Sequence, residues 1–177
     1  MESGVEGEQE VEEELSKHYK ELFTSTEPSE FDEVLQGIPR TISHLMNTKL
    51  IKPVDEKEIQ HATFSMFPNT APGVDGMSPL FFQRYWHIIK DDLIHAITSF
   101  FHTRNLLKSV NETLISLIPK VDNPVILSNF RPISLCSVLY KIISKILANR
   151  LKSVLHPCIT PSQSAFVPGR QILDNVM

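Results

Sequence analysis

Two short apolar segments constrain the fold of this chain most. The segments TLISLIPK (113–120) and FRPISL (130–135) are rich in β-branched and apolar residues, which is typical of β-strands. The polar loop VDNPVILSN connects them, so the sequence predicts a β-hairpin with a long tip. Pro132 has no backbone N–H to donate, so we expect its strand to lie at a sheet edge or at a bulge.

Most of the remaining chain has the spacing of apolar residues that is typical of amphipathic helices. One run predicts a long helix from Pro79 to about His102, and another predicts a helix that begins at Ser137 and stops before Pro157. The predicted fold class is therefore α+β and mostly helical, with several helices and one hairpin at about 113–135.

Shorter helices are expected nearer the N-terminus. Residues 1–14 are rich in glycine and glutamate and are expected to fray, while the pattern from 12 to 23 can form a helix. Residues 31–50 form a second helical or irregular stretch. Asp55, followed by Glu58, resembles a capping box and predicts a helix start.

Charge is distributed unevenly along the chain. The whole sequence has a formal net charge of -4, yet residues 1–33 hold twelve acidic and only two basic residues. From Arg104 onward, nine basic residues face three acidic ones. A basic half indicates a polyanionic partner such as nucleic acid, but an ordinary solvated surface remains an equal alternative.

The predicted helix after Ser137 carries a stripe of lysines. Lys141, Lys145 and Lys152 fall within about 40° of one another when each residue turns the helix by about 100°. This stripe is either a solvated face or a contact to a nucleic-acid backbone. Arg150 instead falls in the middle of the apolar face, so we predict a structural role in which it is paired or bonded to carbonyl oxygens.

The cysteines do not define a metal site. Cys136 and Cys158 are the only two, and His156 adds just one further candidate ligand. Such low cysteine use fits a reducing compartment. The sequence opens with no secretory signal pattern and holds no apolar run long enough to span a membrane, so we expect an intracellular protein without membrane contact.

Four blocks of sequence, taken together and in order, resemble a known family. The blocks are APGVDG, LISLIPK, NFRPISLCSVLYKIISKILANRL and QSAFVPGRQILDN. They closely resemble the start of the reverse transcriptase domain of plant LINE-type (non-LTR) retrotransposons, over roughly residues 15–177. Two small departures occur: the family commonly has lysine where this chain has Thr70, and proline where it has Val74.

The resemblance implies a truncated fingers and partial palm region of a right-hand polymerase. Residues 1–33 would be an acidic, partly disordered linker or helix, and residues 34–78 a helical segment with a Pro/Gly loop. Residues 79–177 would be an incomplete fingers region. In the family, the palm aspartates come later in the chain than Met177, so we expect no catalytic residue here and no activity from this polypeptide alone.

The aspartates that are present do not suggest a metal site. Mg²⁺ would serve the complete enzyme by resemblance, and it needs clustered carboxylates. Asp91 and Asp92 are neighbours in a predicted helix and point about 100° apart, so a solvated face is the better interpretation. Asp75 is expected to fix a turn through its side-chain oxygen. Asp174 has no second acidic residue near it in the sequence with which it could share a metal ion.

Two cations of the hairpin are expected to bind nucleotide. By resemblance, Lys120 and Arg131 occupy the places where the fingers hairpin meets the triphosphate of the incoming dNTP. A guanidinium forks onto phosphate oxygens and a lysine adds a point charge. The plainer alternative is a pair of surface charges on a hairpin.

The last block resembles the segment that lies along the template strand. Gly169 would permit close approach of the backbone, and Gln163 and Arg170 could bond to template sugar or phosphate. Phe166 is either a core residue or a platform for a base.

Three functions are compatible with these features. The first is a fragment of an RNA-directed DNA polymerase, with an RNA template or RNA–DNA hybrid and dNTP as partners. The alternative is a non-catalytic nucleic-acid-binding module with a fingers-like fold. The third is a structural or regulatory helical protein that retains the sequence.

Overall fold

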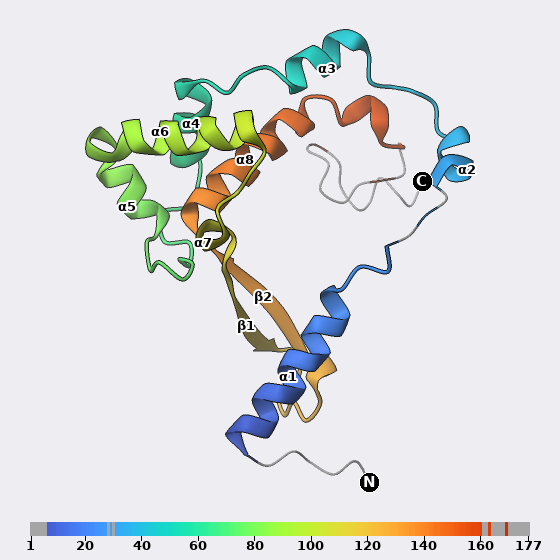
Figure 1. The fold of residues 1–177 in the computed structure, drawn as a ribbon, viewed down its shortest axis with the longest axis vertical. Coiled ribbons are helices and arrows are strands. Elements are labelled where there is room, and N and C mark those ends of the chain that lie inside the picture. The colour runs from blue at the N-terminus through green and yellow to red at the C-terminus, as the bar shows by residue number, and fades with distance from the viewer. Residues whose placement is uncertain (1–6, 28, 30, 161–162, 164–168, 170–177) are drawn as a thin grey trace. The chain divides into compact units, whose positions relative to one another are not determined.

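The described part of the chain is mostly helical, with one two-stranded antiparallel sheet (Figure 1). A computed structural model describes residues 7–27, 29, 31–160, 163 and 169. The helices are α1 (Glu8–Phe23), α2 (Phe31–Gln36), α3 (His44–Leu50), α4 (Glu56–Phe64), α5 (Pro79–Arg84), α6 (Trp86–Thr103), α7 (Lys108–Asn111) and α8 (Val138–Lys152). Short 3-10 turns lie at Leu127–Asn129 and His156–Cys158. The strands are β1 (Thr113–Pro119) and β2 (Phe130–Cys136). The predicted hairpin and helical class are confirmed.

The chain divides into two compact units. One contains residues 1–39 and 116–133, and the other contains residues 40–115 and 134–177. The hairpin passes from the second unit, which holds its base, into the first unit, which holds its tip. None of the helices in the described part of the chain has the length and apolar character needed to cross a lipid bilayer.

The core of the second unit is built by α4, α6 and α8. Each contributes side chains at helical spacing, so a single apolar face of each helix is removed from water. Complete burial of an isoleucine or leucine stabilises the fold by about 1.5–3 kcal/mol. The buried core residues from these three helices are Ile59, Ala62, Trp86, Leu93, Ile97, Val138, Ile142, Ile143 and Ile146.

The predicted helix from Pro79 to about His102 is in fact two helices. Tyr85, with φ -100° and ψ 18°, separates α5 from α6. The Tyr85 N–H still donates to Phe81 O at 3.0 Å, and the Ile89 N–H donates to Tyr85 O at 3.1 Å. Because helical bonding and apolar spacing both continue across the bend, the sequence pattern could not reveal it.

The predicted helix starts are confirmed in detail at two places. Asp55 Oδ1 accepts a hydrogen bond from the Glu58 N–H at 2.8 Å, which caps α4. Ser137 Oγ accepts from the Tyr140 N–H at 3.3 Å and caps α8. At Ser78 the helix begins at Pro79 as predicted, but the serine side chain makes no capping bond.

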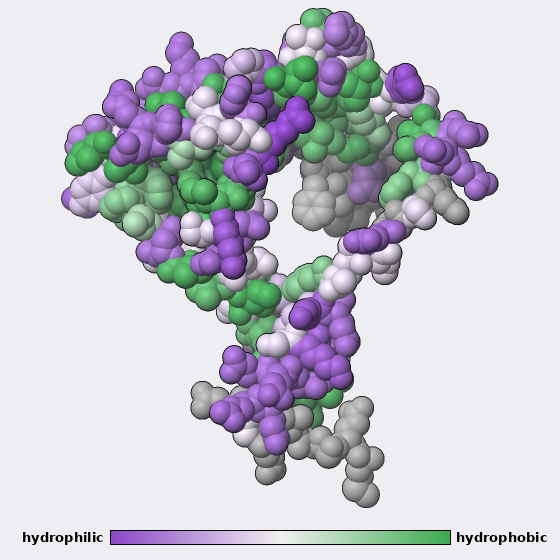
Figure 2. Space-filling view, viewed as in Figure 1, coloured by the Kyte–Doolittle hydropathy of each residue, from purple (hydrophilic) through white to green (hydrophobic). Residues whose placement is uncertain are grey.

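Helix α1 dominates the first unit. It begins at Glu8, a turn earlier than the sequence pattern indicated, so residues expected to fray are helical. Tyr19 is 9% exposed and stacks on Phe23 with ring centroids 6.0 Å apart. Figure 2 shows that hydrophilic side chains cover most of the visible surface of α1.

Candidate nucleotide and nucleic-acid interface

The tip of the hairpin carries the two predicted nucleotide-binding cations. Lys120 directly follows β1, and its backbone N–H donates to Asn129 O at 2.7 Å, which closes the ladder at this end. Its ammonium donates to the Ser128 carbonyl at 2.8 Å. An ammonium has three donors, so two stay free for an anion.

Arg131 lies one residue into β2, and its side chain is exposed. Within the described ranges, the guanidinium makes no ion pair or hydrogen bond. An exposed guanidinium without an internal partner keeps its full fork of donors for a ligand. Both predicted cations therefore lie in the same unit, on exposed positions at the tip half of the hairpin.

The three lysines of the α8 stripe have different surroundings. Lys141 is half-buried and its ammonium donates to the Ala71 carbonyl at 2.6 Å. Lys145 is half-buried and Lys152 is exposed, and neither side chain has a partner among the residues that the structure describes. Of the three lysines in the predicted stripe, Lys141 therefore already has a hydrogen-bond partner, and the ammonium groups of Lys145 and Lys152 are available to bind a ligand.

The predicted template-strand residues are described only in part. Gln163 is exposed, and its backbone N–H donates to Thr160 O at 3.1 Å. Gly169 has φ +79°, a backbone conformation that favours glycine. A Cβ added to it would meet nothing within 4 Å, so glycine is favoured here by the backbone conformation and not by lack of space. Arg170 and Phe166 lie outside the described residues.

The acidic residues take structural or solvated positions. Asp91 and Asp92 are both exposed on α6. Asp75 Oδ1 accepts from the Met77 N–H at 3.0 Å, which confirms its predicted role in a turn. Within the described ranges, no three or more His, Cys, Asp and Glu side chains lie together in a group that could hold a metal ion.

Arg150 is the centre of a polar network within the second unit. Its Nε donates to Glu58 Oε1 at 2.7 Å and its Nη2 donates to Glu58 Oε2 at 2.8 Å. Its Nη1 donates to the carbonyls of Leu50, at 3.0 Å, and Lys52, at 2.7 Å. The guanidinium also lies 5.3 Å from the centroid of the Phe101 ring. The predicted structural role is confirmed, although spacing alone did not identify Glu58 as the partner.

This pairing shifts the pKa of both groups. The hydrogen bonds from Arg150 hold the pKa of the Glu58 carboxyl below its usual value, against the opposing effect of burial. The same bonds raise the pKa of Arg150, so the pair is ionised throughout the physiological range.

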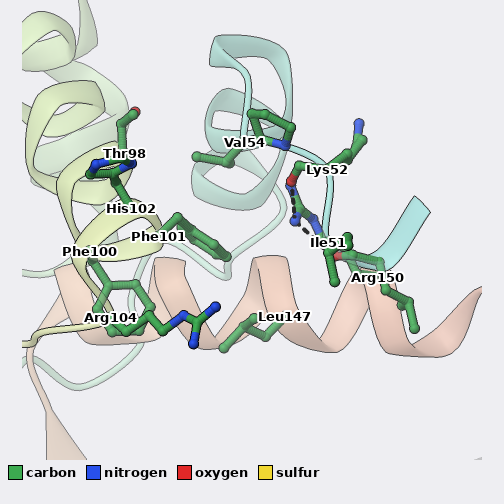
Figure 3. Close-up of a pocket in the computed structure, with 12 residues that line it drawn as sticks. Ile51, Lys52, Val54, Thr98, Phe100, Phe101, His102, Arg104, Leu147 and Arg150 are labelled. Atoms are coloured by element: carbon green, nitrogen blue, oxygen red, sulfur yellow. Dashed lines mark hydrogen bonds between the residues drawn. The ribbon is translucent and has the colours of Figure 1, made fainter. Parts of the chain in front are cut away.

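Beside this network is a largely apolar hollow of about 470 Å³ (Figure 3). Figure 3 shows Arg150 reaching from α8 toward the backbone beside Lys52. Since four of the guanidinium N–H groups are already used, Arg150 offers little to a ligand in the hollow. Sequence reasoning missed the hollow because its lining comes from three separate segments, 50–54, 98–104 and 147–150.

Comparison with known proteins finds a family match over the last third of the chain. Residues 118–177 match the sequence profile of reverse transcriptase (RNA-dependent DNA polymerase). This reverse transcriptase segment begins inside β1 and contains all of β2 and α8. Each predicted site residue lies within it: Lys120, Arg131, Lys141, Lys145, Lys152, Gln163, Gly169 and Arg170.

A longer relative extends the similarity beyond the reverse transcriptase segment. The chain is 37% identical over 160 residues to the "Transposon TX1 uncharacterized 149 kDa protein" of Xenopus laevis. The match covers 89% of this chain and 12% of that protein, so the chain spans about an eighth of the length of its relative. A reverse transcriptase segment and homology to a transposon protein agree with the resemblance seen in the four sequence blocks.

Proposed function

We propose that this chain is part of the fingers region of a LINE-type reverse transcriptase, and that Lys120 and Arg131 contact the triphosphate of an incoming dNTP. The observation that carries the proposal is the family match, which begins in β1 and includes both cations. The assignment to elements of the plant type rests on the four sequence blocks alone.

The chemistry of the hairpin tip supports this role. A triphosphate presents several charged oxygens, and charge-assisted hydrogen bonds to such oxygens are about twice as strong as neutral ones. Arg131 can fork onto two of them, and Lys120 has two ammonium donors that its bond to Ser128 leaves free. Both side chains are exposed, so a nucleotide can reach them.

The nucleic acid itself would lie along α8 and the segment that follows it. Lys145 and Lys152 are the available cations of α8, and each would neutralise a backbone phosphate. Gln163, Gly169 and Arg170 are proposed to follow the template strand. RNA or an RNA–DNA hybrid is the partner that this arrangement favours.

Synthesis by this polypeptide alone is not expected. Nucleotide addition uses two divalent cations held by clustered carboxylates. The described acidic residues do not fit such a site, because they form no cluster of three or more possible ligands. We therefore propose that Mg²⁺ serves the complete enzyme through residues other than those described here.

The experiment that tests the hairpin cations measures binding of a labelled RNA–DNA hybrid in the presence of dNTP. Arg131→Gln and Lys120→Gln should each weaken dNTP-dependent binding roughly tenfold, since a hydrogen bond to a charged group contributes about 1.5–3 kcal/mol. Arg84→Gln is the matched control: it removes one exposed charge outside the reverse transcriptase segment. Equal behaviour of all three variants would refute the proposal.

A non-catalytic nucleic-acid-binding module is the second candidate. It is favoured by the absence of a carboxylate cluster in the part of the chain that the structure describes. A primer-extension assay with Mg²⁺ and dNTP separates the two functions when it is combined with binding. Salt-sensitive hybrid binding that dNTP does not strengthen would favour the module, and incorporation of nucleotide would show that the polypeptide is active by itself.

A further inference from the structure

The loop 71–77 packs unusually closely against the start of α8. Gly73 is buried, and a Cβ added to it would lie 2.5 Å from Ser137 N and 2.7 Å from the Cys136 carbonyl carbon. Real Cβ atoms essentially never approach other atoms so closely, and here the neighbours are backbone atoms that cannot turn aside. Backbone therefore touches backbone at this point, which requires glycine.

A second contact holds the same loop. The ammonium of Lys141, one turn into α8, donates to the Ala71 carbonyl at 2.6 Å. This is a charge-assisted hydrogen bond, which is shorter and stronger than a neutral one. The loop is also shaped internally, because the Gly76 N–H donates to Gly73 O at 3.1 Å.

The place that the loop contacts is the base of the hairpin. Cys136 is the last residue of β2, and Ser137 caps α8. Ser137 Oγ also donates to the Val110 carbonyl at 3.0 Å, and Val110 belongs to α7, directly before β1. One serine thus joins the chain entering β1 to the chain leaving β2, and Gly73 packs on that serine.

We propose that Gly73 and Lys141 are positioning residues that clamp the base of the hairpin and thereby keep β1 and β2 paired, on which the placement of Lys120 relative to Arg131 depends. The inference rests on the proposed function of the hairpin cations. A lone two-stranded hairpin is marginally stable, so its geometry depends on what holds its ends. Misplacement of a ligand-binding group by about 1 Å can cost a factor of roughly 100 in rate.

The test on the glycine uses hydrogen exchange of the full chain. In Gly73→Ala, amides at the hairpin base (110–113 and 134–137) should exchange roughly tenfold faster, because local opening there becomes easier. The fluorescence of Trp86, the single tryptophan, reports the core separately and should keep its native spectrum. Val74→Ala, an exposed position in the same loop, is the matched control and should leave exchange unchanged.

The test on the lysine does not depend on whether Gly73→Ala folds. Lys141→Gln should speed exchange at the loop and hairpin base, and Lys141→Arg should restore protection because it keeps a charged donor. Lys145→Gln makes the same charge change one turn further along α8, where no partner is found among the described residues. It should therefore leave this exchange unchanged.

Hybrid binding then distinguishes positioning from direct contact. Gly73→Ala should weaken dNTP-dependent binding while the salt dependence keeps its slope, because no charge is lost. Unchanged exchange at the hairpin base, or faster exchange throughout α4 and α6, would overturn the clamp. A different result would separate the two proposals. If Arg131→Gln leaves dNTP-dependent binding unchanged, the proposed role of the cations is wrong, and the positioning role is wrong with it. The exchange results would then still show that Gly73 and Lys141 hold the base of the hairpin.

Discussion

Arg150 and Glu58 form a two-point ion pair that joins α8 to α4, with donor–acceptor distances of 2.7 and 2.8 Å. The side chains are only 8% and 16% exposed. The same guanidinium donates to the carbonyl of Leu50, the last residue of α3, and to the carbonyl of Lys52 just after it. One side chain thus connects three segments of the second unit.

Removal of the guanidinium should destabilise the second unit strongly. Arg150→Met keeps a long apolar side chain but leaves Glu58 without its partner. Loss of one member of a buried pair costs about 3–5 kcal/mol, and we expect a value near the lower limit because Glu58 retains some contact with water. Urea unfolding followed by the fluorescence of Trp86 measures this change.

An exposed ion pair between α6 and α4 provides the control. Lys90 lies 3.8 Å from Glu56, and both side chains are about half exposed. Exposed pairs contribute about 0–1 kcal/mol, so Lys90→Gln should change the free energy of unfolding by no more than that. Comparable losses in Lys90→Gln and Arg150→Met would contradict the structural role of Arg150.

The same pair predicts how stability depends on pH. The hydrogen bonds from Arg150 lower the pKa of Glu58 in the folded state below its usual value of 4.5. A carboxyl with a depressed pKa contributes stability that is complete above about pH 4.5 and is lost as the pH falls through the folded value. Urea midpoints measured from about pH 7 downward should therefore fall more steeply in the wild type than in Arg150→Met. Parallel profiles would exclude this linkage.

The N-cap of α4 should make a smaller contribution to the free energy of unfolding than the Arg150–Glu58 pair. Asp55 accepts the Glu58 N–H at 2.8 Å, and this bond lowers the pKa of Asp55. Asp55→Ala should cost about 1 kcal/mol, the typical loss when an N-cap is removed. Asp55→Ser keeps an acceptor oxygen and should recover most of the loss in the same urea experiment. A serine variant as unstable as the alanine variant would argue against capping.

Sequence patterns predicted a helix or strand well where the residues that determine it are neighbours in the sequence. The hairpin followed from two β-branched segments and the loop between them, and the start of α4 followed from Asp55 and Glu58. The burial of α8 followed from its apolar spacing, and that spacing also put Arg150 on the buried face. In each case the signal lies within a few residues of the feature that it predicts.

Contacts between distant segments could not be predicted in the same way. Glu58 is 92 positions from Arg150, and Ala71 is 70 positions from Lys141. Spacing along α8 placed Lys141 in a cationic stripe, but it could not reveal the carbonyl that the ammonium meets. The close approach of Gly73 to Ser137 is a property of two backbones, which no side-chain pattern records.

The last prediction concerns the two available lysines of α8. If they contact phosphates, Lys145→Gln and Lys152→Gln should each weaken hybrid binding regardless of sequence and reduce the slope of log affinity against log salt by about one. Lys49→Gln, which removes an exposed charge from α3, should leave the slope unchanged. Titration of the labelled hybrid at several salt concentrations gives the slopes of the wild type and the three variants. Equal slopes for the wild type and the α8 variants would mean that the stripe is a solvated helix face, because each lost phosphate contact reduces the number of counterions released on binding.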